Sequence, residues 1–221
     1  ASYPEGGSLN DATSMSVPCT LDDVPYASQL IMSLRTADGT LSDADKRRVE
    51  LFKLDLESAY RMWPIAKDSR HLFYFRFLDP DKPIPQYVQD GGQPRDEDMV
   101  YFEKQVLSFG WVRSVEYFVR VSKSVKALAL WTDCPGLEAH FVPRDKQELC
   151  VYVDDFLSLT VGGWGQRAKD RLLALCSLLD LPVSEEKLAT EGAVELLKEF
   201  LGITLSPETE SMFLSPERVS E

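Results

Sequence analysis

The chain has 221 residues, 44% of them hydrophobic and 10% aromatic, which suffices for one large domain or two small ones around a buried core. Its formal net charge of −12 is not the basic balance of a typical nucleic-acid-binding protein. No apolar run is long enough to span a membrane, and four scattered cysteines with two isolated histidines argue against a zinc site. The cysteine usage indicates a reducing, intracellular location, in the cytoplasm or the nucleus.

The acidic charge leaves three interpretations open. The partner is not nucleic acid, or the chain meets nucleic acid through a local basic surface, or the chain is one part of a larger protein whose basic parts lie elsewhere. Because the sequence begins with Ala1 and not with Met, we expect it to be an excerpt of a longer protein.

The first half of the chain predicts a helix and three strands. The helix is expected within residues 20–34, with Thr20 as its N-cap, after a stretch rich in Pro, Gly, Ser and Asp. Alternating or continuous hydrophobicity predicts strands at residues 51–56, 72–78 and 100–107. The Pro- and Asp-rich residues 79–98 between the last two strands predict an exposed insertion.

The first strand carries two charged residues on one face. Lys53 and Asp55 face one way, and Phe52, Leu54 and Leu56 face the other, because side chains alternate along a strand.

Residues 113–130 predict an amphipathic helix. Its apolar side is expected to carry Val115, Phe118, Val119, Ser122, Val125 and Ala129. Arg113, Arg120 and Lys123 fall on the opposite side together with Glu116, which is the pattern of an ordinary solvated face. Residues 132–146 predict a second irregular insertion.

The run from Cys150 to Val161 has the composition of a strand, yet Asp154 and Asp155 interrupt it. Charged residues in a core strand are costly unless they are paired or bind a cation. One interpretation is a tight hairpin with two solvated aspartates at its tip, and the other is a site for Mg²⁺, which prefers carboxylate oxygens.

The last part of the chain predicts one further helix and a strand pair. The helix covers residues 166–180, with Ala168, Leu172, Leu175, Cys176 and Leu179 facing inward. Residues 199–205 predict one strand, residues 206–211 a turn and residues 212–214 a returning strand. Ser215 and Pro216 predict the start of a helix.

This order of elements predicts an α+β fold, an antiparallel sheet with helices packed on one face. The strand of Asp55 can lie beside that of Asp154 and Asp155, so that three carboxylates converge on one edge of the sheet. Because three neighbouring anions repel strongly, a pair of Mg²⁺ or Mn²⁺ ions is expected there, as in two-metal phosphoryl transfer.

Five segments in order resemble the sequence boxes of reverse transcriptases. The most specific is Tyr152-Val153-Asp154-Asp155, which resembles the YxDD box. The other four are Lys53–Tyr60, Leu107–Ser114, Pro182–Lys187 and Phe200–Ile203, which resemble the first catalytic box, the nucleotide-supporting box, the lysine-bearing segment and the primer-grip hairpin. The first loop, Ser2–Asp11, is similar to that of DIRS-type retrotransposons.

The resemblance implies a right-hand polymerase palm with partial fingers, an RNA-directed DNA polymerase that binds primer, template and dNTP. It implies partial fingers at residues 1–50, a palm at 51–205 with a finger insertion at about 66–107, and a primer-grip hairpin with the start of a thumb connection at 206–221. Thumb and other finger parts would belong to a longer polyprotein.

The resemblance also assigns roles to single residues. Asp55, Asp154 and Asp155 would bind two Mg²⁺ ions with the carbonyl of Leu56, and Lys187 would be a general acid. Tyr60, Phe109 and Gly110 would line the nucleotide pocket, and the face of Arg113, Arg120 and Lys123 would be a template-side surface.

Two features depart from the family pattern. Ser108 stands where a proline is usual before Phe-Gly, and Glu116 stands where a small or neutral residue is usual. These departures leave an alternative open, a domesticated, catalytically weak or inactive palm that serves as a structural or interaction module. A third interpretation, an unrelated α+β binding protein, would require five matches by chance.

Overall fold

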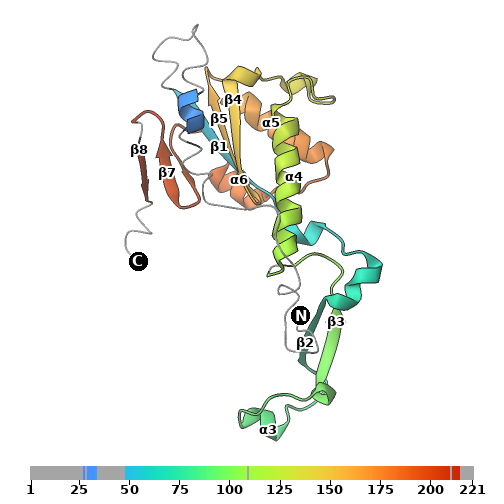
Figure 1. The fold of residues 1–221 in the computed structure, drawn as a ribbon. Helices are drawn as coiled ribbons and strands as arrows, with labels where there is room; N and C mark the ends of the chain where they lie inside the picture. Colours follow the sequence, from blue (N-terminus) through green and yellow to red (C-terminus); the bar gives the residue numbers. More distant parts are fainter. Residues whose placement is uncertain (1–26, 28, 34–47, 109, 210, 215–221) are drawn as a thin grey trace. The chain divides into compact units, whose positions relative to one another are not determined.

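The computed structural model describes residues 27, 29–33, 48–108, 110–209 and 211–214 (Figure 1). The chain divides into two units, one of residues 1–16 and 60–114 and the other of residues 17–59 and 115–221. The described elements combine helices with antiparallel strands, so the α+β class predicted from the sequence is confirmed. Among the described helices, none is long and apolar enough to cross a bilayer.

The unit of residues 60–114 is built on a two-stranded antiparallel hairpin, β2 (Tyr74–Leu78) and β3 (Met99–Glu103). Two short helical segments precede β2, η1 (Ala59–Met62) and η2 (Lys67–Leu72), and two lie between β2 and β3, α3 (Gln86–Gln89) and η3 (Asp96–Asp98). Residues 79–98 link the two strands and include no buried residue, as expected for an exposed insertion. The predicted strand at 72–78 begins only at Tyr74, because η2 occupies the residues before it.

The other unit has a central three-stranded antiparallel sheet in the order β1-β5-β4. Its strands are β1 (Val49–Asp55), β4 (Gln147–Tyr152) and β5 (Asp155–Val161). Two long helices, α4 (Val112–Leu130) and α5 (Gly165–Leu178), lie beside this sheet (Figure 1). The sheet contributes the fully buried side chains of Phe52 and Phe156 to the core. Phe118 of α4 and Leu175 of α5 are fully buried as well, so this core excludes water.

The opposite face of the sheet is covered by different elements. Val49, Leu51, Leu157 and Leu159 belong to a core cluster with Ala27, Leu30 and Ile31 of the helical residues 27 and 29–33, and with Phe200 and Leu205. Phe200 and Leu205 come from a second antiparallel sheet, β6 (Lys198–Phe200), β7 (Ile203–Ser206) and β8 (Ser211–Leu214). The remaining short elements are η4 (Glu138–His140), η5 (Arg144–Lys146) and α6 (Glu185–Glu191).

A buried arginine joins α5 to the end of α4. Arg171 is 1% exposed, and its guanidinium donates to the carbonyl oxygens of Ala129 (2.7 Å), Leu137 (3.2 Å), His140 (3.3 Å) and Trp131. The last carbonyls of a helix lack partners within the helix and carry partial negative charge, so a cation is favourable there.

The structure corrects the predicted strand at residues 199–205. Leu201 and Gly202 both have positive φ, 53° and 79°, and form a two-residue turn between β6 and β7. Tight hairpin turns need this backbone conformation, which glycine adopts readily and leucine does not. The segment is therefore a hairpin, and the predicted return at residues 212–214 is confirmed as β8.

Two predicted side-chain positions are wrong. Glu116 was placed on the solvated face of α4, but it is 2% exposed and accepts a hydrogen bond from Arg120 one turn later (2.6 Å). This partner offsets part of the penalty for burying a carboxylate. Leu179, expected inward, is 40% exposed because α5 ends at Leu178.

Several predictions lie outside the described residues. They are the N-cap Thr20, the loop Ser2–Asp11, Phe109 and the helix start at Ser215 and Pro216.

Candidate functional site

Two aspartates meet where β1 ends and β5 begins. Asp55 is the last residue of β1, and its Cα partner across the antiparallel pair is Asp155, the first residue of β5. Directly opposed residues place their side chains on the same face of a sheet, a few ångströms apart. The neighbouring Asp55 carboxyl is one of the groups that raise the pKa of Asp155, as expected for two acids so close together.

The third aspartate lies in the turn between β4 and β5. Val153 and Asp154 form this two-residue turn, and the carbonyl oxygen of Asp154 accepts a hydrogen bond from the backbone N–H of Leu56 (3.3 Å). The hairpin interpretation of the sequence is therefore correct, but its tip is pinned to the chain just after β1 rather than fully solvated.

The backbone of the turn is strained. Val153 has a φ of 54°, a left-handed conformation that costs a β-branched residue on the order of 1 kcal/mol or more. The Ser122 hydroxyl of α4 lies within hydrogen-bond distance of the carbonyl oxygens of Val153 and of Phe118 (3.0 Å), and its single proton can serve one of them at a time. Contacts from α4 thus help to hold a conformation that Val153 would not adopt alone.

The site disfavours negative charge on the hairpin aspartates. Burial and, after it, the neighbouring Asp55 carboxyl raise the pKa of Asp155 to about 6, while the Lys53 ammonium acts in the opposite direction. Burial also raises the pKa of Asp154, and the Asp55 charge adds to that effect. The nearby lysine charges do not offset the burial of these carboxylates, so the site favours uptake of a proton or a further cation.

One cation already faces the site. The ammonium of Lys187 donates to Asp55 Oδ2 at 2.6 Å, and the Asp55 side chain is only 10% exposed. This hydrogen bond raises the pKa of Lys187. Lys187 comes from α6, whose N-cap Ser184 accepts the Lys187 N–H and donates its own N–H to the Asp55 carbonyl (3.1 Å). The helix start is therefore attached to the end of β1.

The donor chemistry suits a hard divalent cation, since the three aspartates act on one another electrostatically and two of them have raised pKa values. However, no group of three or more His, Cys, Asp or Glu side chains is arranged to hold a metal ion within the part of the chain that the structure describes. The ammonium of Lys187 occupies one oxygen of Asp55, so a metal ion would have to compete with it.

We compared the sequence with models of protein families and with curated proteins. Neither comparison returned a match.

The structure brings together five of the residues singled out from the sequence: Asp55, Leu56, Asp154, Asp155 and Lys187. Of the nucleotide-pocket candidates, Tyr60 and Gly110 belong to the other unit, and Phe109 lies outside the described residues.

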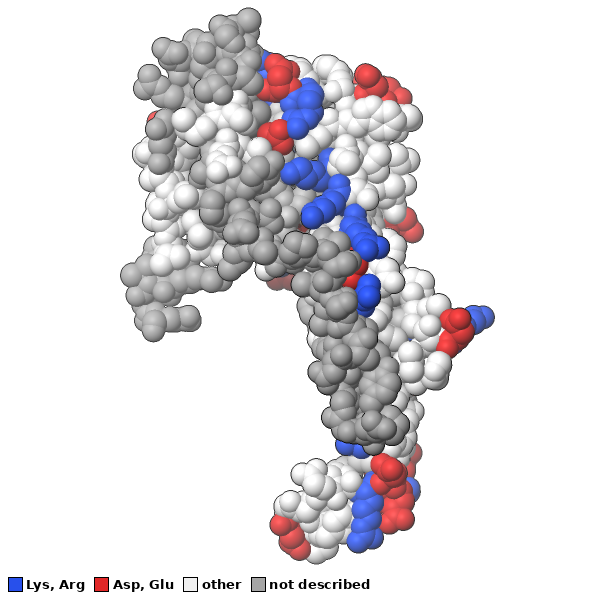
Figure 2. Space-filling model, in the orientation of Figure 1, with Lys and Arg blue, Asp and Glu red and all other residues white. Residues whose placement is uncertain are grey.

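The basic face of α4 is present at the surface. Figure 2 shows Lys and Arg side chains gathered along this helix. Arg120 and Lys123 are exposed and Arg113 is partly exposed, but Arg120 is paired with the buried Glu116. Its charge is therefore partly compensated.

Three residues near the carboxylates were not identified as site residues from the sequence. They are Lys53, whose charge acts on Asp155, Glu191, which binds Lys53 at 2.9 Å, and Ser122 beneath the turn. The sequence held a signal for two of them, since Lys53 alternates onto the face of Asp55 and Ser122 is a polar residue on an apolar helix face. Nothing in the sequence indicates that Glu191 binds Lys53.

Proposed function

We propose that this chain is the palm and part of the fingers of a reverse transcriptase, which adds deoxynucleotides to the 3′-hydroxyl of a primer on an RNA template. The observation that supports this proposal best is the pairing of Asp55 with Asp155 across β1 and β5, with Asp154 in the adjoining turn. Strands distant in sequence thus bring together the carboxylates of two of the boxes that resemble reverse transcriptases.

Asp55, Asp154 and Asp155 are the residues that would hold Mg²⁺ or Mn²⁺, with the carbonyl of Leu56 as a further ligand. When bound, two such ions would stabilise charge on the attacking and leaving oxygens of a phosphoryl transfer. The raised pKa values of Asp154 and Asp155 support this assignment, because a cation would relieve the same shortage of positive charge that protons relieve.

In the proposed reaction the primer 3′-oxygen forms a bond to the α-phosphorus, and the bond from that phosphorus to the pyrophosphate oxygen breaks. Lys187 is the proposed proton donor to the leaving pyrophosphate, which its ammonium group beside the carboxylates permits. Tyr60, Phe109 and Gly110 are the proposed nucleotide-pocket residues, and Arg113, Arg120 and Lys123 the proposed template-side surface.

The domain assignments belong to the same proposal. They are partial fingers at residues 1–50, a palm at 51–205 with a finger insertion at about 66–107, and a primer-grip hairpin with the start of a thumb connection at 206–221. A DIRS-like retrotransposon origin, an intracellular location and further thumb and finger parts in a longer polyprotein are proposed on the sequence alone.

One observation favours a second candidate, a catalytically weak or inactive palm-like module. Asp55 is engaged by Lys187, and the described carboxylates are not arranged as a metal site. In such a module the lysine would replace the cation permanently, and the fold would serve as a structural or interaction element.

Primer extension separates the two candidates. With an RNA template, a DNA primer, dNTPs and Mg²⁺ or Mn²⁺, the polymerase proposal predicts extension that is lost in Asp155→Ala and retained in Asp133→Ala. Asp133 is an exposed aspartate that follows α4, so its loss tests for a general effect of removing a carboxylate. Extension that persists in Asp155→Ala would show that these carboxylates are not catalytic. A complete absence of extension favours the module only when the longer parent protein is assayed, because the proposal places thumb and finger parts outside this chain and the chain alone can then be inactive in either case.

A further inference from the structure

The helix α6 that carries Lys187 has little to hold it in place. It spans only Glu185–Glu191 and contains no buried residue. A helix of this length is not stable on its own in water, so tertiary contacts must fix it. Its ends are attached through the backbone, since Ser184 N–H donates to the Asp55 carbonyl and the Gly192 carbonyl accepts a hydrogen bond from Lys169 Nζ (2.5 Å).

Between these ends, two ion pairs connect α6 to β1. Lys187 binds Asp55 at 2.6 Å, and Glu191 binds Lys53 at 2.9 Å. Lys187 and Glu191 are four residues apart and share one face of the helix, and Lys53 and Asp55 are two residues apart and share one face of the strand. The spacings match, because four helical residues rise about 6 Å and two strand residues rise about 6.6 Å.

The order of the charges specifies one register. Along α6 the cation Lys187 comes before the anion Glu191. Along β1 the cation Lys53 comes before the anion Asp55, and because the helix and the strand run in opposite directions, each charge meets one of opposite sign. If α6 slipped by one turn along β1, Lys187 would approach Lys53, or Glu191 would approach Asp55, and like charges would meet. Such repulsion against the wrong arrangement gives specificity even where each pair adds little stability.

We propose that the Lys53–Glu191 ion pair is a positioning device that holds α6 in register on β1 and thereby keeps the Lys187 ammonium at Asp55. In the polymerase reaction proposed above, on which this role rests, Lys53 and Glu191 act through Lys187 and touch neither primer nor nucleotide. Glu191 has the clearer role of the two, because Lys53 also acts on Asp155.

The test measures how fast the amine of Lys187 reacts in the metal-free protein. A limited amount of an acetylating reagent is added with EDTA present, and mass spectrometry of the peptides gives the rate for each lysine. Glu191→Gln should accelerate the modification of Lys187 about threefold, in line with the modest strength of a half-exposed ion pair. Lys53→Met should do the same, and the double variant should add nothing further, because both changes remove one interaction.

Glu186→Gln is the matched control, because it removes the same charge from an exposed position of α6 that forms neither pair. Lys169 serves as an internal reference, since its ammonium binds the Gly192 carbonyl just after the helix. The proposal predicts that Lys187 alone reacts faster in Glu191→Gln.

An unchanged rate at Lys187 in Glu191→Gln would overturn the proposal. Equal acceleration at Lys187 and Lys169 would also overturn it, because the pair would then maintain the helix itself and not its register. The measurement needs no metal, primer or nucleotide, so its result does not depend on whether the protein extends a primer.

Discussion

Replacing Asp155 by asparagine tests the electrostatics of the site without any metal or substrate. Burial and the neighbouring Asp55 carboxyl raise the pKa of Asp155 from about 4 in an unfolded chain to about 6 in the folded protein. At neutral pH this side chain is mainly ionised, so it opposes folding. An asparagine amide is neutral and, unlike the ionised carboxylate, has hydrogen-bond donors, so the substitution should stabilise the metal-free protein.

The expected change in the free energy of unfolding follows from the raised pKa of Asp155. A difference of about two pKa units corresponds to about 3 kcal/mol at pH 7.5, which is an upper limit because Asp155 is only partly buried and solvent screens its charge. We therefore expect a gain of about 1 kcal/mol in the free energy of unfolding. Because the folded-state pKa is the higher one, the unfavourable contribution weakens as the pH falls through about 6, and the gain should drop to about half at pH 5.

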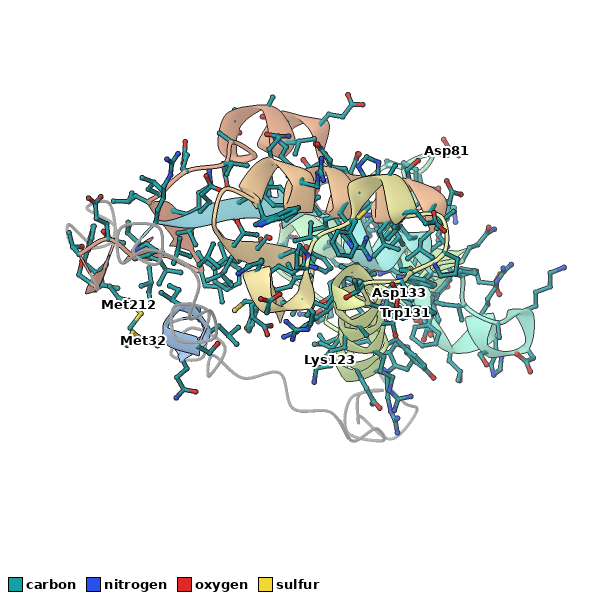
Figure 3. All side chains as sticks on the ribbon, turned by 90° about the horizontal axis from the view of Figure 1, so that it is seen from above. Met32, Asp81, Lys123, Trp131, Asp133 and Met212 are labelled. Atoms are coloured by element: carbon teal, nitrogen blue, oxygen red, sulfur yellow. The ribbon has the colours of Figure 1, made fainter. Side chains whose placement is uncertain are left out.

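Urea denaturation of the two proteins in EDTA, followed by circular dichroism at pH 7.5 and pH 5, measures this difference. Asp133→Asn is the control, an exposed aspartate on the segment after α4 (Figure 3), and its stability should change little. Destabilisation by Asp155→Asn at pH 7.5, or a gain that does not shrink at pH 5, would refute the assigned electrostatics.

Two further predictions concern the metal site and the core. Millimolar Mg²⁺ or Mn²⁺ should raise the melting temperature, and Asp154→Asn should abolish the rise, since a ligand of the folded state stabilises it; no shift in the unsubstituted protein would contradict the proposed site. Arg171→Leu should lower the free energy of unfolding by about 3 kcal/mol in urea denaturation, because four carbonyl oxygens lose their donor. A loss below about 1 kcal/mol would show that these carbonyls find other partners.

The sheet at the centre of the site was predictable from its pattern. Lys53 and Asp55 alternate with Phe52 and Leu54, and this period of two identifies β1 and the face on which Asp55 lies. The opposition of Asp55 and Asp155 was also expected, because an antiparallel pairing of the two strands brings their charged ends together.

The sequence-based predictions failed at a turn and at side chains whose positions depend on partners elsewhere in the fold. The hydrophobic pattern of residues 199–205 predicted one continuous strand, because leucine does not favour the positive φ that Leu201 adopts; only the resemblance at Phe200–Ile203 implied a hairpin. Glu116 has the helical position of a solvated residue, yet its side chain is buried and pairs with Arg120 one turn later, which the hydrophobic periodicity does not indicate. The link from Glu191 to Lys53 depends on where α6 meets the sheet, which periodicity does not specify.

The pairing of β5 with β1 also determines when the site can form. β4 and β5 are neighbours in sequence and can pair as a local hairpin. β1 can pair with β5 only after the chain has been synthesised as far as Val161. Contacts between distant segments form slowly because a long loop must close first. During synthesis, Asp154 and the turn that carries it can therefore be in place before Asp55 joins them. Asp55 joins Asp154 and Asp155 only when β1 pairs with β5, so the candidate site depends on a contact between strands about a hundred residues apart.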